Sequence, residues 1–521
     1  MSARTRVSPG ARSQASPLRP SVAQLEWRPL RPLWRVARSS SNPVIPSSPG
    51  GSLEFEQVYD RLPDRQADQH MEPSAFTVSF WLCTTASSSD LPVLVSDKDW
   101  NGGDRADVTS HHDFGVTRTS GSEPGWAIAL GLDGAWAWNV GDGKNRLDYR
   151  PPAPAQMVAD GDWHLLAFSV DPTLVEARLY RDGVNVAVYS LAGLTKLHSG
   201  EPPTQAAVIG ETPVQIEDLR IEPGAESPAD IEHRWRQRQV SVSAPRVATA
   251  RVSRLRVMAW NIWHGGRRDG DGAGLTATID AIRTAGADVV AMQETYGSGA
   301  HIAAGLGFSY YLRSSNLSVM SRYPIVATHD LYEPFRFGGV TLQLSPDQRL
   351  KLFSLWIHYL PDYGGRMKDV DTEVTEALLL AEEMETRGRE IDQILALLQP
   401  TLAQSDKVPV IVAGDFNSPS HLDWGEDTRP RHRDLVVDWP VSRSMERAGF
   451  VDAFRHLHPD PVSVPGFTWS PRSETSWKDR IDYVYLHGSS LRPVSATVHD
   501  EQAPRWPSDH AAVVVDVEIA P

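Results

Sequence analysis

The chain has 521 residues, of which 40% are hydrophobic and 17 are Trp, so its cores can be well filled and wholesale disorder is excluded. A single cysteine excludes a disulfide framework within the chain and a zinc ribbon, so any metal must be bound by oxygen atoms or imidazoles. The net charge is −15, and the acidic C-terminal half argues mildly against tight, nonspecific binding of long polyanions. No apolar run approaches the roughly 18 residues of a transmembrane helix, and a chain of this length predicts two or more domains.

Residues 1–51 are rich in Arg, Ser and Pro, and the first 50 carry eight Arg and one Glu. They lack the apolar core of about 7–15 residues that a secretory signal requires. We therefore expect a disordered tail. Two alternatives stay open, an Arg-rich targeting peptide and a misassigned start codon that hides a secretion signal, so the sequence predicts no particular localisation.

Residues 52–235 contain short strand-like runs separated by Gly, Asp and Pro. The alternation from Glu176 to Gly183 predicts a strand with Ala177 and Leu179 on one face, followed by a hairpin turn at Asp-Gly. Such a succession of short strands is typical of an antiparallel β-sandwich. The clearest runs are FTVSFWL at 76–82, GDWHLLAFSVD at 161–171, LYRDG at 179–183 and EDLRI at 217–221.

These runs resemble the laminin-G-like, concanavalin-type sandwiches, a family of binding and structural modules. The resemblance implies a jelly-roll sandwich and a carbohydrate or protein ligand, whose identity does not transfer from the family. Within this segment, four oxygen-bearing side chains lie close to two glycines, at Asp97, Asp99, Asn101 and Asp104. They could coordinate Ca²⁺, and a solvated, turn-rich loop is an equally good interpretation.

Residues 236–253 are small, polar and interrupted by Pro, which is typical of an interdomain linker. From residue 254 to 521, strand-like apolar runs alternate with helical segments, which predicts one large α/β domain. Helices are expected at Thr278–Ala285 and Val370–Leu398. The second should have a solvated acidic side and an apolar core stripe. That stripe consists of Leu378, Met384, Ile391, Ile394, Leu395 and Leu398.

Polar residues typical of hydrolase sites stand at the ends of the strand-like runs of residues 254–521. Strand ends are where α/β folds bring side chains from distant parts of the sequence into one crevice. Taken singly, each position also fits a structural role, such as a turn, a helix cap or a buried histidine. Their recurrence in one domain predicts a shared site. The residues are Asn261, Glu294, His358, Asp415, Asn417, Asp482, Asp509 and His510.

Through these motifs the domain resembles the endonuclease/exonuclease/phosphatase superfamily. The motifs follow the family's order and span nearly all of residues 256–518. The resemblance implies a four-layer α/β sandwich like that of deoxyribonuclease I, with two mixed β-sheets face to face and helices outside. The motifs are MAWNIWHGG at 258–266, ADVVAMQET at 287–295, LWIHYL at 355–360, AGDFNSPSHLDW at 413–424, RIDYVYL at 480–486 and WPSDHAAVVVDV at 506–517.

The resemblance also implies a metal-dependent phosphoester hydrolase. Glu294 is expected to be the principal metal carboxylate, helped by Asn261 and Asp509. Hard oxygen ligands without a thiolate suit Mg²⁺ or Mn²⁺. Asp415 is expected to orient and deprotonate the attacking water, and Asn417 to hold that water or a phosphoryl oxygen.

Two histidines complete the expected site. His510 corresponds to a histidine that contacts the scissile phosphate, with Asp482 fixing its tautomer and stabilising its charged form. His358 corresponds to a second phosphate-contacting histidine of the nucleolytic and sphingomyelinase branches. Four tryptophans nearby could stack on a base or sugar or pack in the core, and packing is the better prediction for most of them. They are Trp260, Trp263, Trp424 and Trp469.

The substrate stays open at this point. Residues 251–521 contain 27 basic and 36 acidic residues, which slightly favours a small, lipid or sugar phosphoester over nucleic acid. A nuclease acting on DNA or RNA is the alternative, and a glycan- or surface-binding protein with a vestigial enzyme domain is an alternative of another class. Selectivity is expected to depend on the charged insertion 418–442 and on the sandwich.

Overall fold

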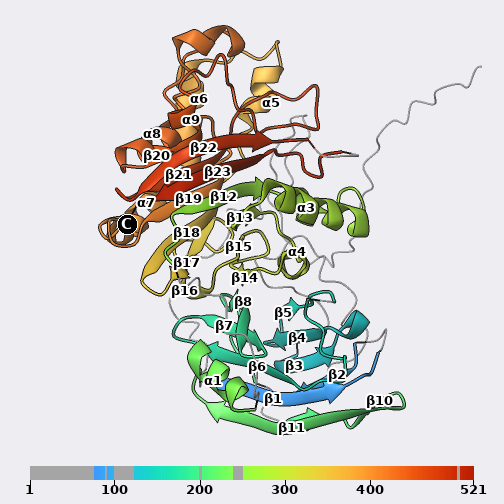
Figure 1. The fold of residues 1–521 in the computed structure, drawn as a ribbon. Coiled ribbons are helices and arrows are strands. Elements are labelled where there is room, and N and C mark those ends of the chain that lie inside the picture. Colours follow the sequence, from blue (N-terminus) through green and yellow to red (C-terminus); the bar gives the residue numbers. More distant parts are fainter. Residues whose placement is uncertain are drawn as a thin grey trace, which may run out of the picture. The chain divides into compact units, whose positions relative to one another are not determined.

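The computed structural model describes residues 75–87, 91–98, 123–153, 155–198, 202–238, 250–501 and 505–520 (Figure 1). These residues belong to one compact unit of the chain. The predicted tail of residues 1–51 and most of the predicted calcium site lie outside them. Asp97 is described, and its carboxylate accepts a hydrogen bond from the Trp126 backbone N–H at 2.6 Å and contacts His198 Nδ1 at 3.2 Å.

The described residues 75–238 form the predicted antiparallel sandwich, which we call the sandwich domain. One set of strands follows the order β10-β11-β1-β6-β7-β8, and the facing sheet follows β5-β4-β3-β2-β9. The elements are β1 Phe76–Thr84, β2 Val93–Ser96, β3 Gly125–Leu130, the 3₁₀ turn Leu132–Gly134, β4 Trp136–Gly141, β5 Arg146–Tyr149, β6 His164–Asp171, β7 Glu176–Arg181, β8 Val184–Ser190, β9 Thr204–Gln205, β10 Val208–Ile209, β11 Thr212–Pro223 and α1 Pro228–Arg238.

Alternation along β1 and β6 explains the two faces of the first sheet. Phe80 and Phe168 point into the core between the sheets, where Trp126 and Trp138 also lie. Their neighbours point the other way, and Trp81 packs with side chains of α1. The predicted hairpin is confirmed, since β7 pairs with β8 across a turn at Asp182-Gly183.

The described residues 254–520 form the α/β domain. Its elements are β12 Arg254–Asn261, α2 Trp263–Gly266, α3 Asp271–Ala285, β13 Val289–Gln293, α4 Gly299–Leu306, β14 Ser309–Leu312, β15 Ser318–Ser321, β16 Ile325–His329, β17 Phe337–Ser345, β18 Gln348–Trp356, α5 Tyr363–Lys368, α6 Glu376–Glu385, α7 Arg387–Leu402, β19 Val410–Asp415, the 3₁₀ turn Glu426–Arg431, α8 Pro440–Arg447, β20 Val451–Asp452, α9 Ala453–Leu457, β21 Asp482–His487, β22 Leu491–His499 and β23 Ala512–Ile519.

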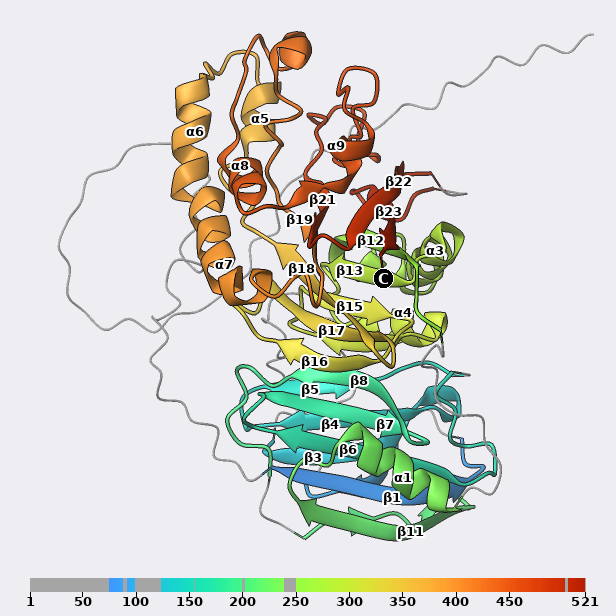
Figure 2. The same ribbon diagram turned by 60° about the vertical axis from the view of Figure 1, so that its left-hand side comes forward.

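Two mixed sheets of this domain pack face to face, as predicted. One contains the strands β14-β15-β13-β12-β23-β22, and the other follows β16-β17-β18-β19-β21-β20. Along β12, Val257 and Ala259 face the second sheet, whereas Met258 and Trp260 face the layer of α3 and α4. Helices α7 and α8 cover the outer face of the second sheet, and Figure 2 shows α7 beside β18. These layers make up the expected four-layer sandwich.

The sandwich and α/β domains share a sheet, which the sequence did not predict. Strand β8 pairs in parallel with β14, so a continuous sheet of 12 strands runs from β10 to β22 (Figure 1). A ring contact between Tyr189 and Tyr310, with centroids 5.8 Å apart, lies at the same junction. The junction therefore combines backbone pairing with aromatic packing.

One predicted helix was wrong in its bounds and in its faces. The segment 370–398 contains α6 and α7, which are separated at Thr386, whose φ of −119° and ψ of −100° are not helical. Met384 is exposed and Leu378 is only partly buried, so neither belongs to a core stripe. The acidic side is not fully solvated either, because Glu383 is completely buried in an ion pair with Arg387.

Among the described residues, no helix combines the length and the apolar character needed to cross a membrane.

Candidate active site

The ends of four central strands of the α/β domain converge from its two sheets. Asn261 ends β12 and Glu294 follows β13 in the first sheet, while Asp415 ends β19 and Asp482 begins β21 in the second. Asp415 and Asp482 are register partners across the β19–β21 pair. His510 lies just before β23, the neighbour of β12. The structure therefore brings together residues that are up to 249 positions apart, from 261 to 510.

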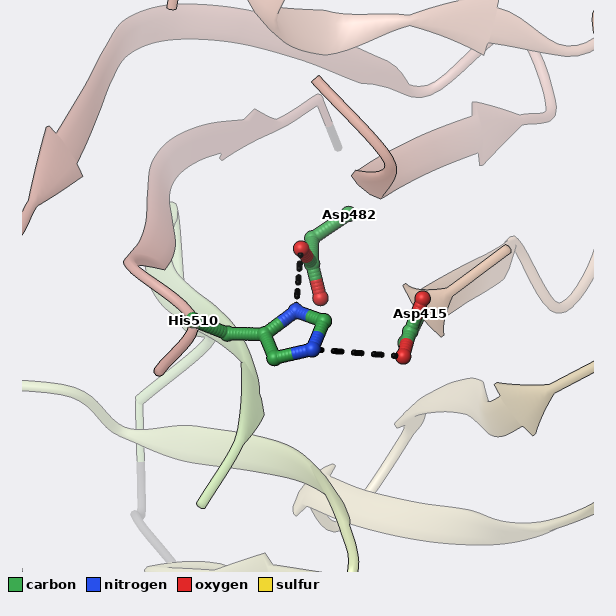
Figure 3. A group of neighbouring side chains, drawn as sticks. All are labelled: Asp415, Asp482 and His510. Atoms are coloured by element: carbon green, nitrogen blue, oxygen red, sulfur yellow. Dashed lines mark hydrogen bonds and ion pairs between the residues drawn. The ribbon is translucent and has the colours of Figure 1, made fainter. Parts of the chain in front are cut away.

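His510 lies between two carboxylates (Figure 3). Its Nδ1 is 2.9 Å from Asp482 Oδ2, and its Nε2 is 3.8 Å from Asp415 Oδ2. All three side chains are almost completely buried. Burial alone would lower the pKa of His510, but the charges of Asp482 and Asp415 outweigh it and raise the pKa to about 10. The imidazole is therefore held in its charged form and can donate hydrogen bonds from both nitrogens.

Asp415 is held by backbone and amide donors. Its Oδ1 accepts from the Asn417 backbone N–H at 2.9 Å, and its Oδ2 accepts from Asn261 Nδ2 at 3.1 Å. Burial raises the pKa of Asp415 to about 7, against the lowering effect of His510. The preceding Gly414 is required, because a Cβ there would lie 2.1 Å from the Leu355 carbonyl oxygen. A carboxylate with this pKa is poised to take up a proton near neutral pH.

Asn261 connects the carboxylates of the two sheets. Its Nδ2 also donates to Glu294 Oε1 at 3.2 Å, while its Oδ1 accepts from the Trp263 backbone N–H at 3.0 Å. The Ser508 hydroxyl donates to the Asn261 carbonyl at 2.6 Å and accepts from the His510 backbone N–H at 3.0 Å. Ser508 thereby fixes the position of the His510 segment relative to the end of β12.

Glu294 and Asp509 form the second carboxylate group of the site. Glu294 has a φ of 56°, and its Oε2 accepts from the His264 backbone N–H at 2.9 Å. Burial and the nearby charge of Glu294 together raise the pKa of Asp509 to about 6, against the lowering effect of His510. Asp509 Oδ1 is buried with no hydrogen-bond partner in the described structure. An unsatisfied carboxylate oxygen beside a second carboxylate fits a divalent cation that takes oxygen ligands.

A second set of ligand atoms belongs to Asp415, Asp482 and His510, whose donor atoms lie within 4.8 Å of one another. A metal would need the lone pair of a neutral His510 nitrogen, whereas the two carboxylates favour the protonated ring. The group of Glu294 and Asp509 is therefore the better cation site of the two. The side-chain amide of Asn261 points its N–H groups, and not its oxygen, at the carboxylates of Glu294 and Asp415.

His358 lies beside the site on the loop after β18. Its backbone N–H donates to Glu390 Oε2 at 2.8 Å, and its carbonyl accepts from Arg387 Nη1 at 3.4 Å. The Ser418 hydroxyl donates to Glu383 Oε1 at 2.5 Å, so the Glu383–Arg387 ion pair also supports the segment that follows Asn417. The sequence prediction missed these helix residues. The i, i+4 spacing of Glu383 and Arg387 is a signal of pairing but not of burial.

Most of the four tryptophans near the site pack in the core, as predicted. Trp260 and Trp424 are fully buried, and Trp424 stacks on His432 within the predicted insertion 418–442. Trp469 packs edge-on against His510, with ring centroids 4.8 Å apart. The part-exposed Trp263 ring has the guanidinium groups of Arg268 and Arg472 at 5.0 and 4.9 Å. Much of the insertion is therefore core, and of the four tryptophans Trp263 and Trp469 are the part-exposed ones.

This fold and this arrangement define a class of protein, the metal-dependent phosphoesterases with a deoxyribonuclease I-like fold. A buried carboxylate, a histidine between two carboxylates and a second group of carboxylates meet where strands from two sheets end.

Comparisons with known proteins agree. Residues 258–510 match the Endonuclease/Exonuclease/phosphatase family, and residues 61–232 match the Concanavalin A-like lectin/glucanases superfamily. An uncharacterised protein of Caenorhabditis elegans is 30% identical over 290 residues, which are 50% of this chain and 90% of that protein. The chain belongs to the endonuclease/exonuclease/phosphatase family.

Two solved structures are also similar. An endonuclease/exonuclease/phosphatase from Beutenbergia cavernae is 21% identical, with 52% of this chain and 72% of that chain covered and a TM-score of 0.34. TDP2 from Caenorhabditis elegans is 17% identical, with 51% and 74% covered and a TM-score of 0.35.

Proposed function

We propose that the chain hydrolyses a phosphoester of a small, lipid or sugar molecule with Mg²⁺ or Mn²⁺, and that Asp415 activates the attacking water. The observation that carries the proposal is His510, which Asp482 and Asp415 flank at 2.9 and 3.8 Å, beside the unpartnered oxygen of Asp509. Such a set supplies a base, a hydrogen-bond donor for a phosphate and ligands for a cation.

Glu294 and Asp509 would hold the cation, with Asn261 orienting the Glu294 carboxylate through its amide. When bound, the cation would supply positive charge to the non-bridging phosphate oxygens and to the leaving alkoxide. The unpartnered oxygen of Asp509 and the raised pKa of its carboxyl support this assignment. A buried carboxylate without a partner is unfavourable, and a neighbouring cation would stabilise its charged form.

Asp415 takes the proton of the attacking water in this proposal. Its second oxygen is held by the Asn417 backbone N–H, which leaves the oxygen near Asn261 and His510 to face the reacting atoms. A raised pKa makes the carboxylate a stronger base than a solvated Asp. The Asn417 side chain donates to the Ile357 carbonyl at 2.8 Å, so in this structure it fixes the loop that precedes His358.

His510 donates a hydrogen bond to a phosphoryl oxygen as charge develops there. Asp482 keeps the ring charged and oriented through Nδ1, which leaves Nε2 for the phosphate. His358 is proposed as a second phosphate contact. Its ring Nδ1 contacts the backbone of Leu360 at 3.0 Å, which orients the ring.

The choice of a small, lipid or sugar phosphoester depends on charge. The 27 basic and 36 acidic residues of the segment 251–521 provide no excess of positive charge for a nucleic-acid backbone. A nuclease is the alternative, and the Arg268–Trp263–Arg472 arrangement favours it, because guanidinium and aromatic groups bind phosphates and bases. For the sandwich domain we propose a carbohydrate or protein ligand, on its match to the concanavalin-like superfamily.

A panel of substrates tests the proposal. Purified full-length protein is incubated with supercoiled DNA, sphingomyelin, inositol phosphates and a bis-aryl phosphate, with and without chelator. We expect metal-dependent turnover of at least one small or lipid substrate, and its loss in Asp415→Asn. Asp347→Asn, an exposed carboxylate in the turn between β17 and β18, is the matched control. Turnover of DNA alone would favour the nuclease, and no metal-dependent turnover of any substrate would favour a binding protein.

A further inference from the structure

Strand β14 would be an edge of the α/β domain if β8 of the sandwich domain did not pair with it. Figure 1 shows β8 next to β14, and the two strands pair in parallel. An open strand edge presents unpaired backbone groups, and here the sandwich domain supplies the missing partner. The pairs in register are Tyr310 with Ala187, Tyr311 with Val188 and Leu312 with Tyr189.

Arg313, the residue after β14, connects the two domains through its side chain. This side chain is almost fully buried and forms an ion pair with Asp330 at 2.7 Å. It also donates to the hydroxyl of Ser190, the last residue of β8, at 3.2 Å. Ser190 in turn donates to Asp330 at 3.1 Å, and the Tyr311 hydroxyl donates to the other Asp330 oxygen at 2.8 Å. One sandwich residue therefore completes a buried network of the α/β domain.

The loop that begins at Arg313 supports the segment containing Glu294. The Asn316 side-chain oxygen accepts from the Glu294 backbone N–H at 2.8 Å, and its carbonyl accepts from Thr295 N–H at 3.1 Å. Its amide group donates to the Phe335 carbonyl at 2.9 Å, and the side chain is fully buried. Asn316 has no exposed surface for contact with a substrate, so its contacts serve to hold other groups.

The segment that Asn316 supports has an unfavourable backbone. Glu294 and Tyr296 have φ values of 56° and 35°, which non-glycine residues rarely adopt. Such a conformation persists only where surrounding contacts fix it. The contacts come from the same loop, since the Ser315 carbonyl accepts from the Tyr296 N–H at 2.7 Å.

We infer that Asn316 is a positioning residue for the metal carboxylate Glu294, and that the sandwich domain, through Ser190 and Arg313, holds the loop that carries Asn316. The inference rests on the proposed function for the role of Glu294. It gives the sandwich domain a task at the site that is independent of any ligand of its own. Outer partners of metal ligands typically change metal affinity about 10–100-fold when removed.

The same interface offers a matched control. The Thr328 hydroxyl of β16 donates to Glu176 of the sandwich domain at 2.8 Å. Arg178 donates to the Ile325 carbonyl nearby at 3.0 Å. These bonds join the same two domains, and neither of them involves Asn316 or its loop. A change at Thr328 therefore tests the interface without changing the support of Glu294.

The test measures Mn²⁺ binding to the full chain, by calorimetry and by the paramagnetic resonance of free Mn²⁺, together with the thermal midpoint. For Asn316→Leu we expect metal binding about 10–100-fold weaker than in the wild type. For Ser190→Ala we expect a smaller weakening in the same direction, and for Thr328→Val unchanged affinity. The KM for the phosphoester should stay close to that of the wild type in all three variants.

Unchanged Mn²⁺ affinity in Asn316→Leu would overturn the positioning role. Equal effects of Ser190→Ala and Thr328→Val would overturn the role of the sandwich domain, and Ser190→Ala still decides this if Asn316→Leu does not fold. Failure of the proposed function gives a different result. In that case the wild type shows no metal-dependent turnover, while Asn316→Leu still weakens Mn²⁺ binding.

Discussion

The candidate site has two halves, one around His510 and Asp415 and one around Glu294 and Asp509. They differ in how many of their polar groups are paired with other groups of the protein. In one half, His510 has a carboxylate at each ring nitrogen, and Asp415 is held by backbone and amide N–H groups. In the other half, Asp509 has a buried oxygen without a partner, and Glu294 has a strained backbone. Asp482 Oδ1 in the first half is also unpartnered, but the other oxygen of Asp482 pairs with His510. The first half is therefore preorganised around His510, whereas the described carboxylates of the second half form no ion pair and we expect a ligand to complete them. Variants in the two halves should therefore fail in different ways.

The largest effect is expected for Asp415→Asn, which removes the proposed base from the preorganised half. We expect kcat to fall on the order of 10²–10⁴-fold. Because burial raises the pKa of Asp415 to about 7, replacing the carboxylate by a neutral amide should leave the free energy of unfolding at least as high as in the wild type. Steady-state kinetics and denaturant unfolding check the two parts. A variant with kcat near that of the wild type would exclude Asp415 as the base.

The second largest effect is expected for Glu294→Gln, which changes the ligand-dependent half. A cation at about 100 times its dissociation constant should stabilise the wild type by about 2.7 kcal/mol, and chelator should remove this gain. Glu294→Gln should lose most of the gain, whereas Asp482→Asn should keep it. Thermal unfolding with and without Mn²⁺ measures both variants. An equal loss in both would mean that the two halves bind one ion together.

A smaller loss of kcat, on the order of 10²-fold, is expected for Asp482→Asn. The charge of Asp482 contributes most to raising the pKa of His510 to about 10. In wild-type protein without added cation, the His510 ring should therefore stay charged from pH 6 to 9. In the variant its pKa should fall towards or below the ordinary value of about 6.5. Imidazole proton resonances followed against pH test this. A His510 that already titrates near pH 6.5 in the wild type would contradict the difference between the halves.

Replacing His432, which lies outside both halves of the candidate site, should not change activity. Burial lowers the pKa of His432 to about 4, so the folded state favours the neutral ring. Its contribution to stability is complete above pH 6.5 and is lost as the pH falls from 6.5 to 4, by about 3 kcal/mol. His432→Phe keeps a ring stacked on Trp424 and should lose less stability than the wild type over this range. Denaturant midpoints at pH 7.5 and 4.5 provide the measurement, and parallel curves would contradict it.

Much of the fold and the convergence of the site were predictable because each depends on local pattern. Strand-like runs that end in Asn261, Asp415 or Asp482 place these residues at strand ends, and the layered topology brings them together. The family resemblance supplied the order of the motifs. The roles assigned to the site residues remain predictions that the variants above test.

What could not be predicted depends on partners that are distant in sequence. Glu383 looks like a solvated helix residue, and only the tertiary structure buries it against Arg387. The pairing of β8 with β14 leaves no local signal, because any strand edge can accept a partner. Asn316 stands just before the run LSVMS, and a polar residue at the start of a strand was the one available sign of its role.

The pairing of β8 with β14 has a consequence for any attempt to cut the chain into separate domains. Domains often have their own core and could in principle fold alone. Here an α/β fragment beginning at Arg254 would expose the backbone of β14 and leave Arg313 without the hydroxyl of Ser190. Such a fragment would be prone to pair with other copies of itself through that edge. Truncation between residues 238 and 254 should therefore yield an aggregating protein.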